Sequence, residues 1–260
     1  FILKRQFTAN NGDDGDWSLQ RLKKGGTGNK PTPAYIHVFS TSAEKIEEDA
    51  DADENTRDVL LLQSMLRITY TSPRAMHWIT KVLRWLSDKA PQDAKHSDLA
   101  NLLKNYARSK VRESFPLEEG EKQPEGFSIS RIVFAYLDYL LLDDSSKRDF
   151  KFQFRTSIEH FYPQNPRTEQ LGDNVVEKNN LDLLGNLALV SISANSKLSN
   201  NLPKVKALTY GNTIALQSPK LKAMAEITRK DGWGDEQIVA HHNEMIDLLS
   251  NDCKHQANPS

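Results

Sequence analysis

Between residues 55 and 143, apolar residues recur every three to four positions, and this series constrains the fold most strongly. Such spacing is typical of amphipathic helices, which place one apolar face toward a core. It predicts four helices, at about residues 55–70, 73–86, 97–113 and 128–143. Because helices of this kind must bury their apolar faces against other elements, we expect a helical module over residues 55–146.

The pattern changes to an alternation of period two shortly after residue 147. Phe150, Phe152 and Phe154 alternate with polar residues, which predicts a strand over residues 150–155. After a polar loop, a second short strand is predicted at about 187–191, and helices resume at about 194–200, 218–229 and 235–251. The predicted fold class is therefore mainly α with a small β element.

The sequence divides into four predicted segments. Residues 8–34 are rich in Gly, Asn, Asp, Pro and Lys, which is typical of loops, so residues 1–54 are predicted to be a loop-rich connection. The remaining segments are the helical module at 55–146, a second domain with C-terminal helices at 147–252, and a tail at 253–260. The chain begins with Phe1 and carries no signal-like segment, so we expect it to be part of a longer protein.

Charge and cysteine content narrow the classes of function. The formal net charge of −1 argues against a globally basic nucleic-acid-binding protein, but residues 194–230 hold seven bases and one acid. No apolar run reaches the roughly 18 residues of a membrane span, so we expect no membrane partner. Cys253 is the only cysteine, which excludes an internal disulfide and makes a reducing cytoplasm the expected location.

The residues that suggest chemistry lie in three short motifs, around Glu159-His160, Asn186 and Asn195. A carboxylate beside a histidine suits metal-assisted hydrolysis of a phosphodiester, because carboxylate oxygens are preferred ligands of Mg²⁺ and a neutral imidazole accepts a proton near neutral pH. An Asn on the following helix could supply a second ligand oxygen. Adjacent strand residues point to opposite faces, so Glu159 and His160 share one site only if the strand ends or bends there, as Pro163 suggests.

The three motifs together resemble a known family. The patterns EH-x-x-PQ, LGNL-x-L and N-S-x-L-S-N resemble the C-terminal nuclease domain of GmrSD-type restriction proteins, a divergent HNH or ββα-metal nuclease family. They are also similar to the HNH domain of CRISPR effector nucleases, in which two Asn residues lie nine positions apart. The resemblance covers about residues 148–230, and residues 61–78 also resemble the middle region of these proteins.

The resemblance implies an HNH-like ββα-metal nuclease domain that uses Mg²⁺ or Mn²⁺. It implies that His160 is the general base, that Glu159 and Asn195 are metal ligands, and that Asn186 holds the metal-binding loop by backbone hydrogen bonds. In the family a ParB-like, nucleotide-dependent N-terminal domain with a DGQQR-type motif precedes this region. That motif is absent from the present sequence.

The function implied by the resemblance is that of a cytoplasmic endonuclease acting in the restriction of phage or foreign DNA, with modified DNA as a candidate substrate. Lys197 and Lys206, in the basic segment, are predicted to contact DNA phosphates. One base and one metal centre would nick one strand, so cleavage of both strands would need two protomers or two events. An oligomer is therefore compatible with the prediction.

Two alternative functions stay open at this point. One is a non-catalytic DNA-binding or interaction module on a degenerate HNH fold, which plasmid nicking would distinguish from a nuclease. The other is an RNase or toxin nuclease on the same fold, which competing DNA and RNA substrates would separate from a DNase. Taken alone, Asn186 and Asn195 are also ordinary turn and cap residues, and Lys197 and Lys206 could belong to a solvated surface.

Overall fold

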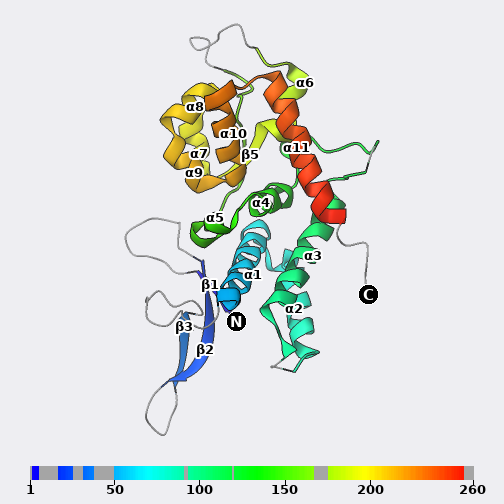
Figure 1. Cartoon of the computed structure of the whole chain (residues 1–260), viewed down its shortest axis with the longest axis vertical. Coiled ribbons are helices and arrows are strands. Elements are labelled where there is room, and N and C mark those ends of the chain that lie inside the picture. Colours follow the sequence, from blue (N-terminus) through cyan, green and yellow to red (C-terminus); the bar gives the residue numbers. More distant parts are fainter. Residues whose placement is uncertain are drawn as a thin grey trace. The chain divides into compact units, whose positions relative to one another are not determined.

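The computed structural model of the chain shows two compact units (Figure 1). Residues described by the structure are 2–5, 17–25, 32–37, 50–90, 93–118, 120–166 and 175–254. The first unit comprises Phe1–Lys104 and Lys147–Gln153, and the second unit comprises Asn105–Ser146 and Phe154–Ser260. The four predicted segments have other boundaries, and as a domain assignment they stay a prediction.

The first unit begins with a three-stranded antiparallel sheet in the order β1 (Ile2–Arg5), β2 (Trp17–Gly25) and β3 (Thr32–His37). In its register Gln20 lies opposite both Ile2 and His37. This sheet occupies part of the range for which the composition predicted a loop-rich connection. The prediction weighed the abundant Gly and Asn residues and overlooked the alternation of apolar and polar residues from Trp17 to Gln20.

The helices of the first unit lie close to their predicted ranges. They are α1 (Ala50–Thr69), the 3₁₀ turn η1 (Pro73–Ala75), α2 (His77–Ser87) and the beginning of α3 (His96–Ser114), which continues into the second unit. Helix α1 begins several residues before the predicted start, within an acidic stretch whose negative charge suits a helix N-terminus. On α1, Asp58 forms ion pairs with Lys104 at 3.0 Å and Lys147 at 3.4 Å.

The second unit holds a small sheet and most of the remaining helices. Strand β4 (Ser157–His160) pairs antiparallel with β5 (Leu187–Val190), and α7 (Ile192–Leu198) follows directly, which gives the predicted ββα order. The other elements are η3 (Gly126–Ser128), α4 (Arg131–Leu140), α5 (Asp144–Asp149), α6 (Lys178–Leu181), η5 (Leu184–Asn186), α8 (Pro203–Thr209), α9 (Gly211–Gln217), α10 (Pro219–Asp231) and α11 (Asp235–Lys254).

The strand predicted at residues 150–155 was wrong, because the backbone from 150 to 156 lies in neither a helix nor a strand. The first strand of the pair is instead β4, at residues 157–160. The short partner β5 pairs with these four residues only. The Arg155 side chain is buried and forms an ion pair with Asp138 of α4, so this segment is held by side-chain contacts.

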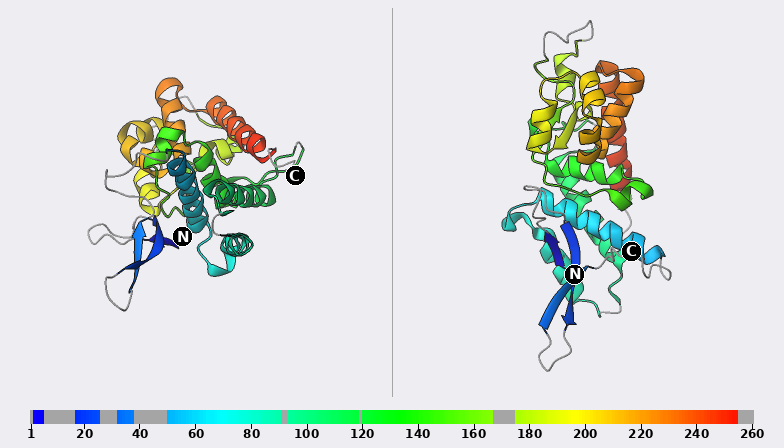
Figure 2. Two further views of the ribbon diagram at one scale, coloured as in Figure 1. Left: turned by 60° about the horizontal axis from the view of Figure 1, so that its bottom comes forward. Right: turned by 90° about the vertical axis from the view of Figure 1, so that its left-hand side faces the viewer.

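The core of the second unit lies where helices α7 to α10 and the start of α11 meet the small sheet (Figure 2). Trp233 packs edge-on against Phe161, with ring centroids 5.3 Å apart. Two serine N-caps begin helices here: Ser191 accepts a hydrogen bond from Ala194 N in α7, and Ser218 accepts one from Leu221 N in α10. The buried cluster consists of Phe161, Tyr162, Val176, Ala188, Val190, Ala194, Leu198, Ala207, Ile214, Leu221, Met224, Ala225, Trp233 and Ile238.

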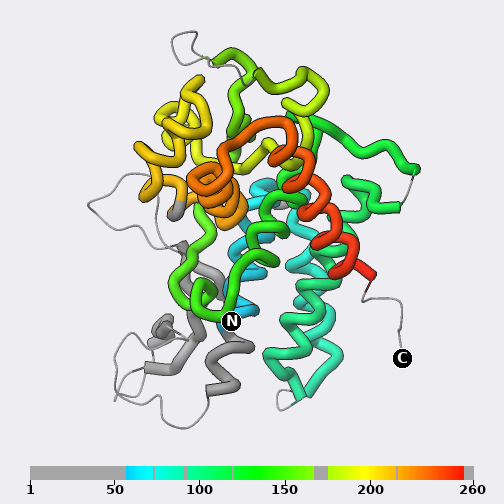
Figure 3. The backbone as a smooth tube through the Cα atoms, turned by 45° about the horizontal axis from the view of Figure 1, so that its top comes forward, coloured from blue at the N-terminus to red at the C-terminus, as the bar shows by residue number. Residues whose placement is uncertain are grey.

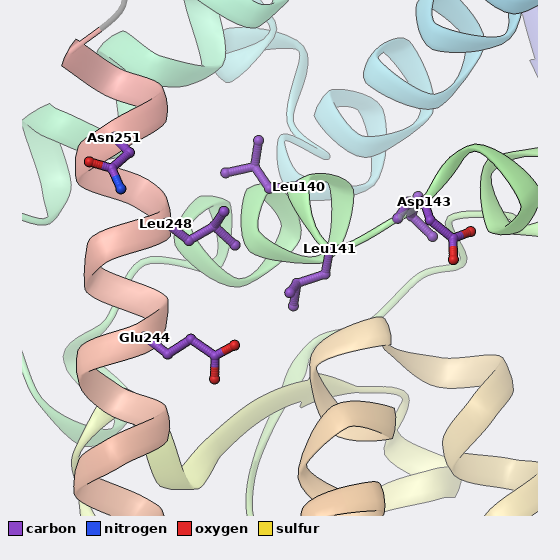
Figure 4. Close-up of a pocket in the computed structure, with 7 residues that line it drawn as sticks. Leu140, Leu141, Asp143, Glu244, Leu248 and Asn251 are labelled. Atoms are coloured by element: carbon purple, nitrogen blue, oxygen red, sulfur yellow. The ribbon is translucent and has the colours of Figure 1, made fainter.

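Helix α11 also lies against α4 (Figure 3). A pocket is lined by residues of α11, the end of α4 and the segment that follows α4 (Figure 4). The lining residues are Leu140, Leu141, Leu142, Asp143, Glu244, Leu248 and Asn251. None of them belongs to the three motifs, so this pocket is separate from the candidate site described below. Within the described part of the chain, no helix combines the length and apolar character needed to cross a membrane.

Candidate active site

Strand β4 places the two central motif residues in different surroundings. Glu159 lies opposite Ala188 and His160 lies opposite Leu187 in the β4–β5 pair, so the strand is regular through both residues. It ends after His160, and a bend follows it. Because neighbouring residues of a paired strand point to opposite faces, the Glu159 and His160 side chains do not share one site.

The Glu159 carboxylate is buried against a buried lysine. Lys206 Nζ donates hydrogen bonds to Glu159 Oε1 at 2.6 Å, to the backbone oxygen of His160 at 2.8 Å and to that of Phe161 at 2.9 Å. Burial raises the pKa of Glu159 and lowers that of Lys206, while their mutual attraction opposes both shifts. The two side chains therefore form an internal ion pair beneath the end of β4.

This arrangement does not fit the predicted metal site. Glu159 Oε1 already accepts a hydrogen bond from an ammonium group, which would repel a divalent cation placed at the same oxygen. Asn195 lies half-buried on α7, and its assignment as a metal ligand stays a prediction. Across the described ranges, no group of three or more His, Cys, Asp and Glu side chains could hold a metal ion.

On the other face, the His160 imidazole contacts a carboxylate that the sequence analysis did not identify. His160 Nε2 lies 2.7 Å from Asp182 Oδ1, and Gln164 Nε2 donates a hydrogen bond to the same oxygen at 3.2 Å. The His160 side chain is 7% exposed, whereas that of Asp182 is 43% exposed. The pair thus connects a nearly buried imidazole to a partly solvated carboxylate.

The 3₁₀ turn η3 forms a second wall beside this pair. The Phe127 ring meets the His160 ring edge-on at a centroid distance of 5.2 Å, and Phe127 is 67% exposed. Gly126 N donates a hydrogen bond to Asp182 O at 2.8 Å, and a Cβ at Gly126 would lie 3.1 Å from the Asp182 carboxylate. Gly126 also has a φ of +58°, a conformation that favours glycine.

Asn186 makes backbone hydrogen bonds of the kind that the resemblance implied. Its Oδ1 accepts from Tyr162 N at 2.8 Å, and its Nδ2 donates to Tyr162 O at 3.0 Å and to Leu181 O at 2.9 Å. The Trp233 indole N–H also donates to Asn186 Oδ1, at 3.2 Å. The fully buried amide therefore ties the chain after His160 to the residue that precedes Asp182.

The structure corrects the prediction that Lys206 contacts phosphate. Its side chain is fully buried and its three hydrogen bonds are made inside the protein, so it cannot reach a DNA backbone in this arrangement. Lys220 is also buried, and its Nζ donates to the backbone oxygens of Leu184 and Leu187. Lys197, by contrast, is exposed on α7, and its contact with DNA phosphate stays a prediction.

Two residues beside His160 were missed in the sequence, and their signals were weak. Asp182 follows a polar stretch in which several carboxylates and amides compete as candidates. Phe127 lies in a Gly- and Pro-containing loop more than thirty positions before His160. The one local signal was Gly126, because glycine favours the left-handed backbone conformation and allows the backbone to approach a neighbouring residue closely.

A family model matches residues 117–248, and its description is GmrSD restriction endonucleases, C-terminal domain. The matched range is about half of the chain and includes Phe127, His160, Asp182 and Asn186. Neither a curated protein nor a solved structure matches the chain.

Proposed function

Since the chain belongs to the GmrSD restriction endonuclease family through its C-terminal domain, we propose that it is an HNH-type endonuclease that hydrolyses DNA phosphodiester bonds. Its biological role would be the restriction of phage or foreign DNA. The observation that carries this proposal is the position of His160, which lies at the end of β4 inside the matched range and beside a partly exposed carboxylate.

His160 is the proposed general base. A neutral imidazole would take a proton from a water molecule as its oxygen attacks the phosphorus, the bond to the leaving oxygen would break, and solvent would protonate that oxygen. Such a base typically contributes about 10²–10⁴-fold to the rate. The Glu159–Lys206 pair takes no part in this step, because it is buried on the opposite face of β4.

Two exposed cations of the second unit support binding of a polyanion. Lys197 on α7 and Lys204 on α8 are exposed and have no carboxylate partner among the described residues. The acidic stretch at residues 44–58 lies in the first unit. Lysines of this kind bind nucleic acids by displacing condensed counterions from the phosphates, so we propose this lysine surface for the DNA backbone.

We propose separately that DNA cleavage requires Mg²⁺ or Mn²⁺, and we assign no residue as a ligand of that ion. This proposal rests only on the resemblance of the three motifs to HNH nucleases, and Glu159 is not assigned to it because of its pair with Lys206. Chelation by EDTA is expected to abolish cleavage, and added Mg²⁺ or Mn²⁺ to restore it. Full activity in excess EDTA would contradict the requirement but would leave the assignment of His160 intact.

Nicking of supercoiled plasmid DNA by the full chain tests the proposed function. His160→Ala is expected to lower the rate by about 10²–10⁴-fold while circular dichroism stays unchanged. His77→Gln is the matched control, because His77 is exposed on α2 outside the matched range. A folded His160→Ala protein that nicks at the rate of the control would refute the proposal, and preferential cleavage of competing RNA would favour an RNase instead.

A further inference from the structure

We infer that Asp182 is a positioning residue that fixes the tautomer and orientation of the His160 imidazole. The inference rests on the proposed function, since it concerns the proposed base of that reaction. The inference is based on the 2.7 Å contact between His160 Nε2 and Asp182 Oδ1. No motif of the sequence pointed to this residue.

The contact assigns the two ring nitrogens. A carboxylate only accepts hydrogen bonds, so the nitrogen that faces Asp182 must carry the proton. In the neutral ring, His160 is then protonated at Nε2, and Nδ1 keeps the lone pair that can accept a proton from water. The opposite tautomer would place two acceptors 2.7 Å apart, so Asp182 disfavours it.

Asp182 can hold the ring because it is itself held at several points. Its backbone oxygen accepts from Gly126 N, and the carbonyl before it, at Leu181, accepts from Asn186 Nδ2. Its carboxylate accepts from Gln164 Nε2. Because Asn186 also bonds to both backbone groups of Tyr162, one buried amide links the loop of Asp182 to the end of the strand that carries His160.

The ring is confined on a second side as well. The Phe127 ring lies edge-on to the imidazole, which limits its rotation about the Cβ–Cγ bond. Asp182 and Phe127 thus leave one ring orientation, with Nδ1 as the free base. The ring would then take a proton from water at Nδ1 while Nε2 stays hydrogen-bonded to Asp182.

The first test reads the tautomer without using activity. Long-range ¹H–¹⁵N correlation spectra of the full chain, at a pH where the ring is neutral, report which nitrogen carries the proton, and His160→Gln identifies the signal. The wild type is expected to show the Nε2–H form, and Asp182→Ala to lose that preference. An Nε2–H form that persists unchanged in Asp182→Ala would overturn the inference, even if the protein proved to have no nuclease activity.

The second test uses plasmid cleavage kinetics. Asp182→Ala is expected to lower kcat about 10- to 100-fold with little change in KM, because partners that orient a functional side chain contribute on this scale. Asp182→Asn, which keeps an acceptor oxygen but not the charge, should recover part of the loss. The control is Asp247→Ala, an exposed acid on α11.

Two kinetic outcomes would count against Asp182 as a positioning residue. One is an Asp182→Ala rate equal to that of the Asp247→Ala control. The other is a variant with an unchanged tautomer whose rate is restored by more Mg²⁺, since that result would make Asp182 a metal ligand. A wild-type chain without any cleavage would refute the proposed function, whereas the tautomer spectra would still decide the inference.

Discussion

Replacing Lys206 with Met would break the internal ion pair while keeping most of the side-chain volume. The change leaves the Glu159 carboxylate and the backbone oxygens of His160 and Phe161 without their shared donor. Removing one partner of a buried pair typically costs about 3–5 kcal/mol, because the remaining charge stays desolvated. Since the pKa of Glu159 is already raised by burial, protonation of the carboxyl would relieve part of this cost.

Native-state hydrogen exchange, measured by mass spectrometry on peptides that contain β4 and β5, gives the local free energy of opening in the second unit. A loss of about 3–5 kcal/mol would speed the exchange of the slowest amides by about 150- to 5,000-fold. Adding Glu159→Gln to the variant removes the unpaired charge and is expected to recover at least half of the lost free energy.

Lys204→Met is the matched control, since Lys204 lies on the same helix but is exposed. Its exchange rates should stay within about threefold of the wild type, because surface substitutions usually change stability by less than 0.5 kcal/mol. If Lys206→Met accelerated exchange by less than about tenfold, the reasoning about the energetic cost of breaking the buried pair would be refuted.

Three further predictions follow from the second unit. Lys197→Ala should weaken DNA binding about equally across sequences and flatten the slope of log K against log salt by about 0.9, whereas Lys206→Met should leave the slope unchanged; anisotropy titrations at several salt concentrations compare them. Gly185→Ala should cost several kcal/mol in chemical denaturation because its Cβ would lie 2.1 Å from Ile238 O, while Gly234→Ala, whose Cβ meets only Gln237 Oε1 at 3.6 Å, should cost under about 1 kcal/mol. Burial, with the charge of Lys220 nearby, lowers the pKa of His241 to about 2, so below pH 6.5 the unfolded chain binds one more proton and unfolding free energy falls by about 1.4 kcal/mol per pH unit; a His241→Gln slope equal to that of the wild type between pH 6.5 and 4.5 would contradict this.

Local patterns predicted much of the second unit, and tertiary contacts account for the rest. Helices α3, α10 and α11 and strand β5 lie close to their predicted ranges because hydrophobic period and turn residues are local signals. On α8 the same reasoning fails, since Leu208 is 66% exposed whereas Lys206 is fully buried. The buried carboxylate and carbonyl oxygens that hold Lys206 lie more than forty positions earlier, and no local pattern reports them.

In the candidate site, too, residues within short motifs could be predicted from the sequence, whereas contacts between distant residues could not. His160 and Asn186 stood out because each lies in a short motif, and the Asn186 side chain forms hydrogen bonds with the backbone of Tyr162. Asp182, the carboxylate that contacts the His160 imidazole, did not stand out because it lies in no motif. Its position depends on a tertiary contact with Gly126, which sequence spacing does not show. Sequence spacing also could not reveal that β4 stays regular through Glu159, which separates that carboxylate from His160.

The salt bridge between Arg108 and Asp252 sets a practical limit on how short an expressed piece of this protein can be. Arg108 donates to both carboxylate oxygens of Asp252, at 2.9 and 2.7 Å, and the Tyr136 hydroxyl donates to the same group at 2.6 Å. The family match at residues 117–248 stops short of both Arg108 and Asp252. A fragment cut at those limits lacks Asp252, so the hydroxyl of the buried Tyr136 side chain would lose its acceptor. We therefore expect a fragment of residues 105–254 to express as folded protein and a fragment of residues 117–248 to aggregate.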